Sequence, residues 1–313
     1  MVHESRDVES QPSGYMHYGY AGSLSEFGMP YELPKSNSWI LKRSIAGFPY
    51  YDAMGCYPLF CCENWQYLAD DLEDVGDDFV TLSIVTDPFG DYDEQYLKVC
   101  FPDVCKPFKQ HYVTDLSRPV KSFVSEHHRR NARKASESVR VHVCKTPAEY
   151  LDEWERLYSN LVSRHGIRGV TAFSRKAFEK QLQVPGIMAM RAEYEERIVG
   201  MLLWYVQNGI GYYHLGAYSD LGYELKCSFA LFLNAIHYFA DADVRWLNLG
   251  AGAGLNQKEE DGLSRFKHGW SNETRPTYFC GRIFDRKKND EIMSARRISK
   301  TDYFPAYRTG EFS

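Results

Sequence analysis

The pattern of apolar and polar residues is clearest in the second half of the chain. Three apolar stretches are separated only by Glu195–Glu196 and Asn208–Gly209, which is typical of an antiparallel meander with two tight turns. Large apolar residues, among them Phe229 and Ile236, then recur at helical spacing on one face of a long segment. From residue 138 the predicted order is strand, helix, helix, three strands, helix, strand, short helix and strand, which indicates an α+β layout.

The first part of the chain contains both apolar residues at helical spacing and short apolar runs typical of strands. Residues 63–75 have apolar residues at helical spacing and an acidic outer face, which predicts a helix. Residues 79–89 are typical of a buried strand that ends at a proline turn, and 96–101 and 108–116 predict two more strands. Residues 121–138 predict a helix with arginine and lysine crowded toward its end. A mixed α/β region therefore precedes residue 138.

Composition is that of an ordinary soluble globular protein: 313 residues, 44% hydrophobic and 25% charged. A net charge of −5 argues against a dedicated DNA- or RNA-coating protein but allows a local basic patch. None of the eight cysteines lies in a C-x-x-C motif or is matched to a spaced histidine pair, so we expect free thiols and no metal site. The N-terminus lacks a signal-peptide pattern, and the longest apolar run, near 227–240, is too short and polar to cross a membrane. We expect a cytoplasmic protein.

Glycines after the predicted strand 244–250 raise the question of phosphate binding. A Walker loop requires G-x-x-x-x-G-K-[ST], and Lys258 has no Ser or Thr after it. A dinucleotide fingerprint requires G-x-G-x-x-G opening into a helix, whereas Gly250, Gly252 and Gly254 precede an acidic, turn-rich segment. We expect these glycines to permit close approach of a substrate or a neighbouring part of the chain.

Two motifs carry a resemblance to a known family. One is a basic R-R-x-x-R-K segment of a helix, and the other is a G-L-x-x-F-K-x-G-W segment that follows the glycine turn. With the order of elements over about 120–285, these motifs resemble the GNAT superfamily, and more closely its Fem-type branch. The motif residues are Arg129, Arg130, Arg133 and Lys134, then Gly250, then Gly262, Leu263, Phe266, Lys267, Gly269 and Trp270.

The resemblance implies an α+β fold of two tandem GNAT-like domains, with a mixed, largely antiparallel sheet flanked by helices. An extended N-terminal arm would span 1–37, and a degenerate GNAT-like domain that ends in the basic helix would span 38–137. The GNAT-like acyltransferase domain would span 138–285 and contain the acyl-transfer cleft. A charged tail, 286–313, would pack back on the body. We expect the two domains to form one rigid unit.

The resemblance also implies amide-bond formation. Fem-type proteins move an amino acid from aminoacyl-tRNA to an amine on a cell-wall precursor, and other relatives take an acyl group from acyl-CoA. This chain is shorter than typical Fem proteins, shows no coiled-coil insertion and lacks the Q/R-x-x-G-x-G/A pyrophosphate motif before the long helix, so both donors stay open.

We therefore expect an N-acyltransferase without a tightly bound cofactor, which takes its acyl group from aminoacyl-tRNA or acyl-CoA. Its acceptor would be an amine-bearing small molecule or peptide, tRNA would be a partner only as the donor's carrier, and DNA would not be one. Two alternatives remain: a catalytically inactive GNAT-like protein that binds a ligand or partner, and a conventional acetyl-CoA-dependent N-acetyltransferase.

Acyl transfer to an amine needs a base near the nitrogen and fixed donors for the oxyanion. Lys267, in an otherwise aromatic segment, is the leading candidate for holding a donor phosphate or stabilising the oxyanion. Candidate bases are His214, Glu224 and Asp261. Each also has an ordinary structural interpretation, as a core histidine, an acid at the start of the long helix and an N-cap respectively.

The basic helix is a candidate anion site. Arg129 with Arg133, and Arg130 with Lys134, are like-charged pairs at i,i+4, which cost roughly 0.2–0.5 kcal/mol each in an isolated helix. A phosphate of tRNA, CoA or the acceptor would offset that cost, as would acidic residues elsewhere in the chain. The other predicted donor- or substrate-binding residues are Tyr213, Tyr218, Gly250, Gly252, Phe266 and Trp270.

Overall fold

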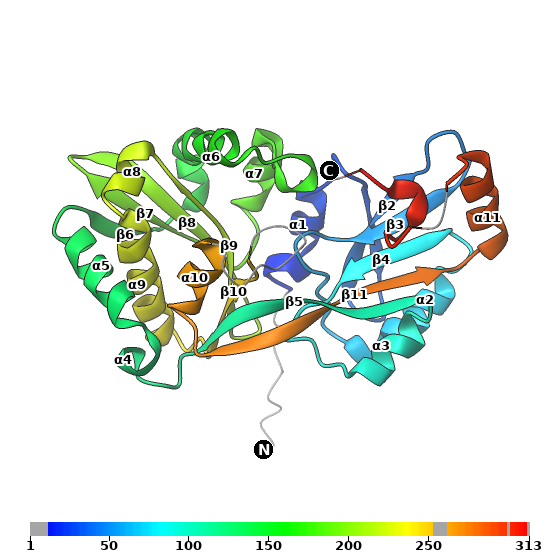
Figure 1. The fold of residues 1–313 in the computed structure, drawn as a ribbon, viewed down its shortest axis with the longest axis horizontal. Coiled ribbons are helices and arrows are strands. Elements are labelled where there is room, and N and C mark those ends of the chain that lie inside the picture. The colour runs from blue at the N-terminus through cyan, green and yellow to red at the C-terminus, as the bar shows by residue number, and fades with distance from the viewer. Residues whose placement is uncertain (1–11, 253–261, 299–300, 312–313) are drawn as a thin grey trace, which may run out of the picture.

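One mixed sheet runs through the molecule in the computed structural model, which describes residues 12–252, 262–298 and 301–311. Within these residues the strand order is β1-β2-β3-β4-β11-β5-β10-β9-β8-β7-β6, and helices flank both halves of the sheet (Figure 1). The strands are β1 (Met29–Leu33), β2 (Ser38–Ser44), β3 (Tyr51–Gly55), β4 (Thr81–Val85), β5 (Val104–Asp115), β6 (Arg140–Cys144), β7 (Ile187–Tyr194), β8 (Arg197–Gln207), β9 (Ile210–Tyr218), β10 (Trp246–Gly250) and β11 (Glu273–Ile283).

The two halves of the chain exchange one strand each at the centre of the sheet. β5 comes from the first half yet pairs with β10, whereas β11 comes from the second half yet pairs with β4. β5 and β11 also pair with each other. On either side of this centre lies a parallel pair, β3 with β4 and β9 with β10, followed outward by antiparallel strands. The predicted α+β fold, with a mixed and largely antiparallel sheet flanked by helices, is confirmed. The predicted domain boundary at residue 138 stays a prediction.

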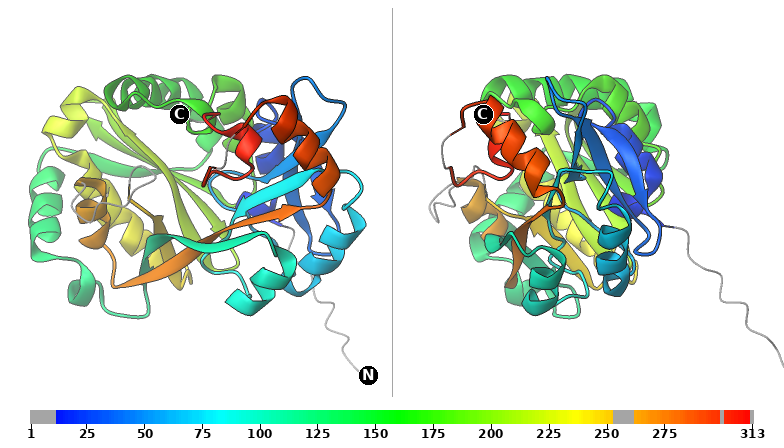
Figure 2. Two further views of the ribbon diagram at one scale, coloured as in Figure 1. Left: turned by 45° about the vertical axis from the view of Figure 1, so that its right-hand side comes forward. Right: turned by 90° about the vertical axis from the view of Figure 1, so that its right-hand side faces the viewer.

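Two layers of helices enclose the second half of the sheet. Helices α5 (Glu126–Ser136) and α9 (Cys227–Ala240) cover one face, over a core that includes Trp204 and Trp270. Helices α6 (Leu151–His165), α7 (Arg175–Gln181) and α1 (Tyr18–Ser23) cover the other face. Figure 2 shows the same layers from two further directions. The remaining helices are α2 (Leu68–Asp74), α3 (Glu94–Cys100), α4 (Val120–Phe123), α8 (Asp220–Glu224), α10 (Gly262–His268) and α11 (Arg286–Ala295), with short 3₁₀ turns η1 (Gly14–Met16), η2 (Trp65–Tyr67), η3 (Pro147–Tyr150), η4 (Gly169–Thr171) and η5 (Ala306–Arg308).

The segment 96–101, predicted as a strand, is instead part of helix α3 apart from its last residue. Asp93 caps this helix, because its side chain accepts a 2.7 Å hydrogen bond from the backbone N–H of Tyr96. Leu97 and Cys100 are then buried three residues apart, on one side of the helix. The cap decides the element here, despite a composition that suits a strand.

Two further predicted elements differ from the structure. Described residues 12–37 are not an extended arm, since they include α1 and β1 and fully bury Tyr20. The predicted helix over 121–138 is interrupted between α4 and α5. Ser125 caps the second of these helices by accepting a hydrogen bond from the backbone N–H of His128, so its own backbone leaves the helical path.

Among the described residues, no helix is long and apolar enough to cross a bilayer. The same residues contain no group of three or more His, Cys, Asp and Glu placed to hold a metal ion. All eight cysteines are free thiols. Burial raises the pKa of the adjacent Cys61 and Cys62 thiols well above the usual value, so neither is a thiolate nucleophile at neutral pH.

Candidate active site

The parallel strands β9 and β10 diverge where β10 ends. They pair from Trp246 to Asn248, after which β9 continues to Tyr218 whereas β10 stops at Gly250. Gly250 has a φ of +76°, in the left-handed region that favours glycine. The sheet therefore opens at this point, and a side chain from another element can enter it.

Helix α10 brings the ammonium group of Lys267 to this opening. The residue is only 6% exposed, and its Nζ donates a 2.6 Å hydrogen bond to the backbone oxygen of Ala251. Nζ also lies 5.7 Å from the ring centroid of Tyr213 on β9. A Cβ atom at Gly250 would lie 3.1 Å from Nζ, so glycine leaves the space through which the lysine passes. A buried cation in this position can stabilise negative charge that develops beside the strand end.

A histidine from the first half of the chain lies at the same strand end. His111, on β5, donates from Nδ1 to Oδ1 of Asn248 at 3.0 Å, and the backbone N–H of Gly250 donates to the same oxygen at 2.9 Å. Because this amide oxygen only accepts, the imidazole proton must be on Nδ1, and Nε2 carries the lone pair. Nε2 makes no hydrogen bond with any residue that the structure describes.

Burial lowers the pKa of His111 to about 3, and the positive charges of Lys267 and Lys109 act in the same direction. The hydrogen bond to Asn248 opposes this shift without cancelling it. The imidazole is therefore neutral at physiological pH. A buried ammonium beside a neutral imidazole can stabilise an oxyanion and take up a proton, the two needs of acyl transfer.

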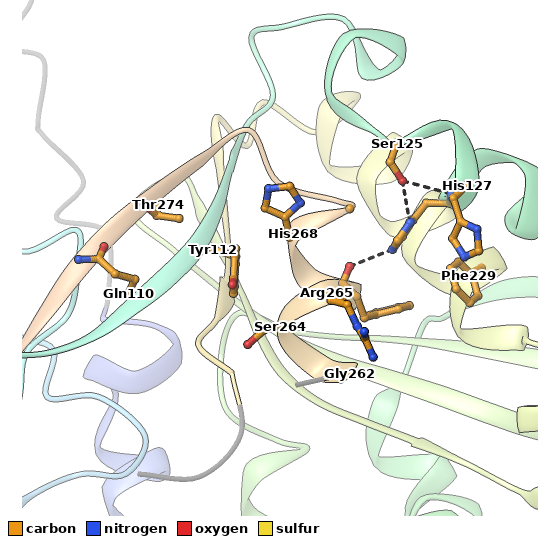
Figure 3. Close-up of a pocket in the computed structure, with 13 residues that line it drawn as sticks. Gln110, Tyr112, Ser125, His127, Phe229, Gly262, Ser264, Arg265, His268 and Thr274 are labelled. Carbon is orange, nitrogen blue, oxygen red and sulfur yellow. Dashed lines mark hydrogen bonds between the residues drawn. The ribbon is translucent and has the colours of Figure 1, made fainter. Parts of the chain in front are cut away.

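A groove of about 900 Å³ lies against β5 (Figure 3). Gln110 and Tyr112 line it, so alternation along the strand places His111 on the opposite face of β5. The walls of the groove come from α5, α9, α10, β5 and β11, and they combine aromatic rings with basic side chains. Arg265, His127 and His268 are exposed at its surface. The lining residues are Gln110, Tyr112, Ser125, His127, His128, Phe229, Gly262, Ser264, Arg265, Phe266, His268, Gly269 and Thr274.

Residues 122–268 match the family described as the acetyltransferase (GNAT) domain, and this segment contains the divergence of β9 and β10 together with Lys267. The match identifies residues 122–268 as a GNAT domain within the chain. This match makes the protein an acyltransferase.

Solved structures share the fold of this chain over most of its length. FemX has a TM-score of 0.67 at 12% identity, covering 90% of this chain and 96% of its own. L-PGS from Bacillus licheniformis has a TM-score of 0.58 at 15% identity, covering 90% of this chain and 92% of its own. No curated protein matches the sequence. At such low identities these likenesses show the fold alone.

The three predicted bases lie in different environments. His214 is buried, with Nδ1 accepting from the Tyr15 hydroxyl at 3.1 Å and Nε2 donating to Oε1 of Gln181 at 3.2 Å. Burial lowers its pKa to about 3, and both nitrogens are used inside the protein, so neither is left to accept a proton from a substrate. Glu224 is exposed and ends α8, whereas α9 begins only at Cys227. Asp261 lies outside the described residues.

The predicted basic residues all lie on the solvent side of α5. Arg129, Arg130, Arg133 and Lys134 are exposed, and none of them forms an ion pair with another described residue. The buried side of this helix, which includes Ala132, packs on α9. The four cations are thus open to an anionic partner on the outer surface.

The other predicted binding residues lie either near the opening between β9 and β10 or in the hydrophobic core. The hydroxyls of Tyr213 and Tyr218 approach each other over Gly216, where an added Cβ would lie 2.5 Å from one and 2.8 Å from the other. Gly250 borders Lys267, as described above, and Gly252 is buried. Phe266 and Trp270 both pack against α9. Trp270 is fully buried, whereas Phe266 is half-buried and lines the groove.

His111 and Asn248 are absent from the candidates that the sequence provides. The strand over 108–116 is correctly predicted, and alternation alone would set His111 apart from its neighbours Gln110 and Tyr112. However, His111 and Asn248 are 137 residues apart and meet only through strand exchange. No local pattern reports that contact.

We expect Gly269→Ala to lower the free energy of unfolding by about 1–3 kcal/mol, as overpacked cores do. An added Cβ would lie 2.1 Å from Cε1 of His128. That ring cannot move freely, because Ser125 Oγ and the Phe266 carbonyl hold its nitrogens at 2.7 Å and 3.0 Å. Urea denaturation measures the change. Gly262→Ala, at the other end of α10 with no atom within 4 Å of its Cβ, is the matched control, and an equal loss there would contradict this explanation.

Proposed function

We propose that this GNAT protein forms an amide by transferring an acyl or aminoacyl group from an activated carrier to an amine. The observation that carries the proposal is the convergence of the buried Lys267 ammonium and the neutral His111 imidazole at the end of β10. The two groups come from different halves of the chain, so both halves contribute to one site.

The proposed reaction divides the chemistry between the two side chains. The acceptor nitrogen attacks the acyl carbon, and the resulting oxyanion is stabilised by the ammonium of Lys267. Nε2 of His111 takes the proton that the attacking nitrogen loses, and the bond between the acyl carbon and the carrier oxygen or sulfur then breaks. The proton passes to the leaving group, which restores the neutral imidazole.

Turnover decides between this proposal and an inactive ligand-binding protein. The purified protein is mixed with an amine acceptor panel and either aminoacyl-tRNA or acyl-CoA, and amide product is measured by mass spectrometry. The proposal requires product with at least one donor class. Ligand-dependent increases in melting temperature without product under any combination would instead favour the inactive binder. Product with acetyl-CoA alone would identify a conventional N-acetyltransferase.

The basic surface of α5 supports a phosphate-bearing donor, since its exposed cations have no acidic partner among the described residues. We expect the double change Arg129→Glu with Arg133→Glu to weaken donor binding by about tenfold or more, because hydrogen bonds to charged groups contribute roughly 1.5–3 kcal/mol each. Fluorescence anisotropy with charged tRNA over a salt series, and competition with CoA, measure the effect.

The salt dependence provides a second readout of the same variant. If tRNA phosphates bind these arginines, the slope of log binding constant against log salt should fall by about one for each phosphate that the variant no longer neutralises. Lys176→Glu with Lys287→Glu, exposed positions on α7 and α11, is the control with the same change in net charge. An equal loss of affinity in both variants would mean that the loss comes from the change in net charge and not from contacts of Arg129 and Arg133.

A further inference from the structure

Arg275, on β11, is held against two aromatic rings near the centre of the sheet. Its guanidinium carbon lies 4.2 Å from the ring centroid of Phe89 and 4.4 Å from that of Trp246. The two ring centroids are 5.8 Å apart. Phe89 follows β4 in the first half of the chain, whereas Trp246 begins β10 in the second. Contact with rings from both halves orients the guanidinium plane and leaves its N–H groups as the polar part.

The guanidinium has no hydrogen-bond or ion-pair partner in the described part of the chain. Asp87 is near enough for Arg275 to lower the pKa of its carboxyl, which burial raises overall. The Asp87 oxygens nevertheless accept hydrogen bonds from other groups. Oδ2 accepts from the Tyr212 hydroxyl at 2.7 Å, and Oδ1 accepts from the backbone N–H of Phe89 at 3.1 Å. The guanidinium is half-buried and carries five donors, and none of its nitrogens is among the buried side-chain atoms without a hydrogen bond. Its N–H groups therefore reach the solvent, where an anion can bind them.

Arg275 is the direct cross-strand neighbour of His111. The two residues are paired between β11 and β5, so their side chains lie on the same face with Cβ atoms roughly 5 Å apart. Trp246, which contacts Arg275, and Asn248, which holds His111, are two residues apart on β10 and share that face. The guanidinium therefore lies beside the imidazole that would accept the proton.

We infer that Arg275 binds an anionic group, a carboxylate or a phosphate, on the acyl acceptor, and so selects amines with a negative charge within a few bonds of the nitrogen. The inference rests on the proposed transfer at His111 and names the acceptor class for that site. Two parallel N–H groups of a guanidinium match two oxygens of either anion, a geometry that lysine does not reproduce. The acceptor would then be held by its anion while its amine faces Nε2.

Three small amines test this inference by binding alone. O-phosphoethanolamine, β-alanine and ethanolamine share a two-carbon amine and differ in carrying a phosphate, a carboxylate or a hydroxyl. We expect calorimetry to show that at least one of the two anionic amines binds wild type about tenfold or more tightly than ethanolamine, as a hydrogen-bonded charge pair provides. The tighter of the two identifies the anion. The Nε–Hε NMR signal of Arg275, assigned by its loss in Arg275→Lys, should shift on saturation.

Variants distinguish bidentate binding by the arginine from a general effect of positive charge. Arg275→Gln and Arg275→Lys should each remove the preference for the anionic amine, whereas Arg245→Gln should change it less than about twofold. Arg245 is the matched control, because it is exposed and also lies over Trp246, at 5.6 Å. Equal binding of all three amines to wild type, or an equal loss in Arg245→Gln, would overturn the inference. These measurements need no turnover, so their failure is distinct from a failure of the proposed reaction, which the Lys267 variants report.

Discussion

Lys267→Met should lower kcat by about 100- to 1000-fold, the loss typical when one fixed donor to an oxyanion is removed. Methionine retains the length and apolar packing of the lysine stem while removing its charge. The side chain is 6% exposed, so the ammonium acts in a water-poor site where its field is little screened. Steady-state kinetics with a saturating donor give kcat directly, and a melting curve confirms that the variant is folded.

Two further variants distinguish a catalytic ammonium from a structural one. Lys267→Arg should not restore activity, because the larger guanidinium would have to fit beside Gly250, where even a Cβ atom added to that glycine would lie 3.1 Å from Nζ. Lys180→Met is the matched control, since Lys180 also donates from Nζ to a backbone carbonyl, that of Gly22, at 2.8 Å. If Lys267→Met keeps wild-type kcat and changes only stability, the proposed role is wrong.

The elements of the second half follow from local patterns, and the structure shows why. Period-two alternation and the turns at Glu195–Glu196 and Asn208–Gly209 locate β7, β8 and β9 within a residue or two. All four of those turn residues have positive φ, although only Gly209 is a glycine, so the chain itself makes tight turns there. Local information of this kind is present in any short window of sequence.

The proposed site depends on contacts that no short window contains. Lys267 is found because its motif is local, as are the cations on α5. His111 reaches the site only because β5 is exchanged into the second half of the sheet, and Arg275 lies beside it only because β11 is exchanged in return. The surroundings of His214 are likewise absent from local patterns, since its partners Tyr15 and Gln181 come from distant segments that no periodicity relates to β9.

His111→Asn should lower kcat by about 100- to 10,000-fold, the range in which general bases contribute. Asparagine can still donate to Oδ1 of Asn248, so the variant removes the lone pair of Nε2 while retaining the hydrogen bond that Nδ1 now makes. His214→Gln is the matched control: it replaces another buried histidine whose pKa burial lowers to about 3, but one whose nitrogens are both engaged. It should alter stability more than kcat.

The pH dependence of the wild-type enzyme gives an independent signature of His111. The pKa of His111 is about 3 in the free protein because burial disfavours the charged form, so the active, neutral imidazole persists at all pH values above that. An anion bound beside it would favour the imidazolium and raise this pKa. We therefore expect kcat, which reports the complex, to fall with acid at a higher pH than the His111 ionisation of the free enzyme, and His111→Asn to lack that fall. An unchanged acid limb in His111→Asn would assign the limb to another group and remove the imidazole from the mechanism.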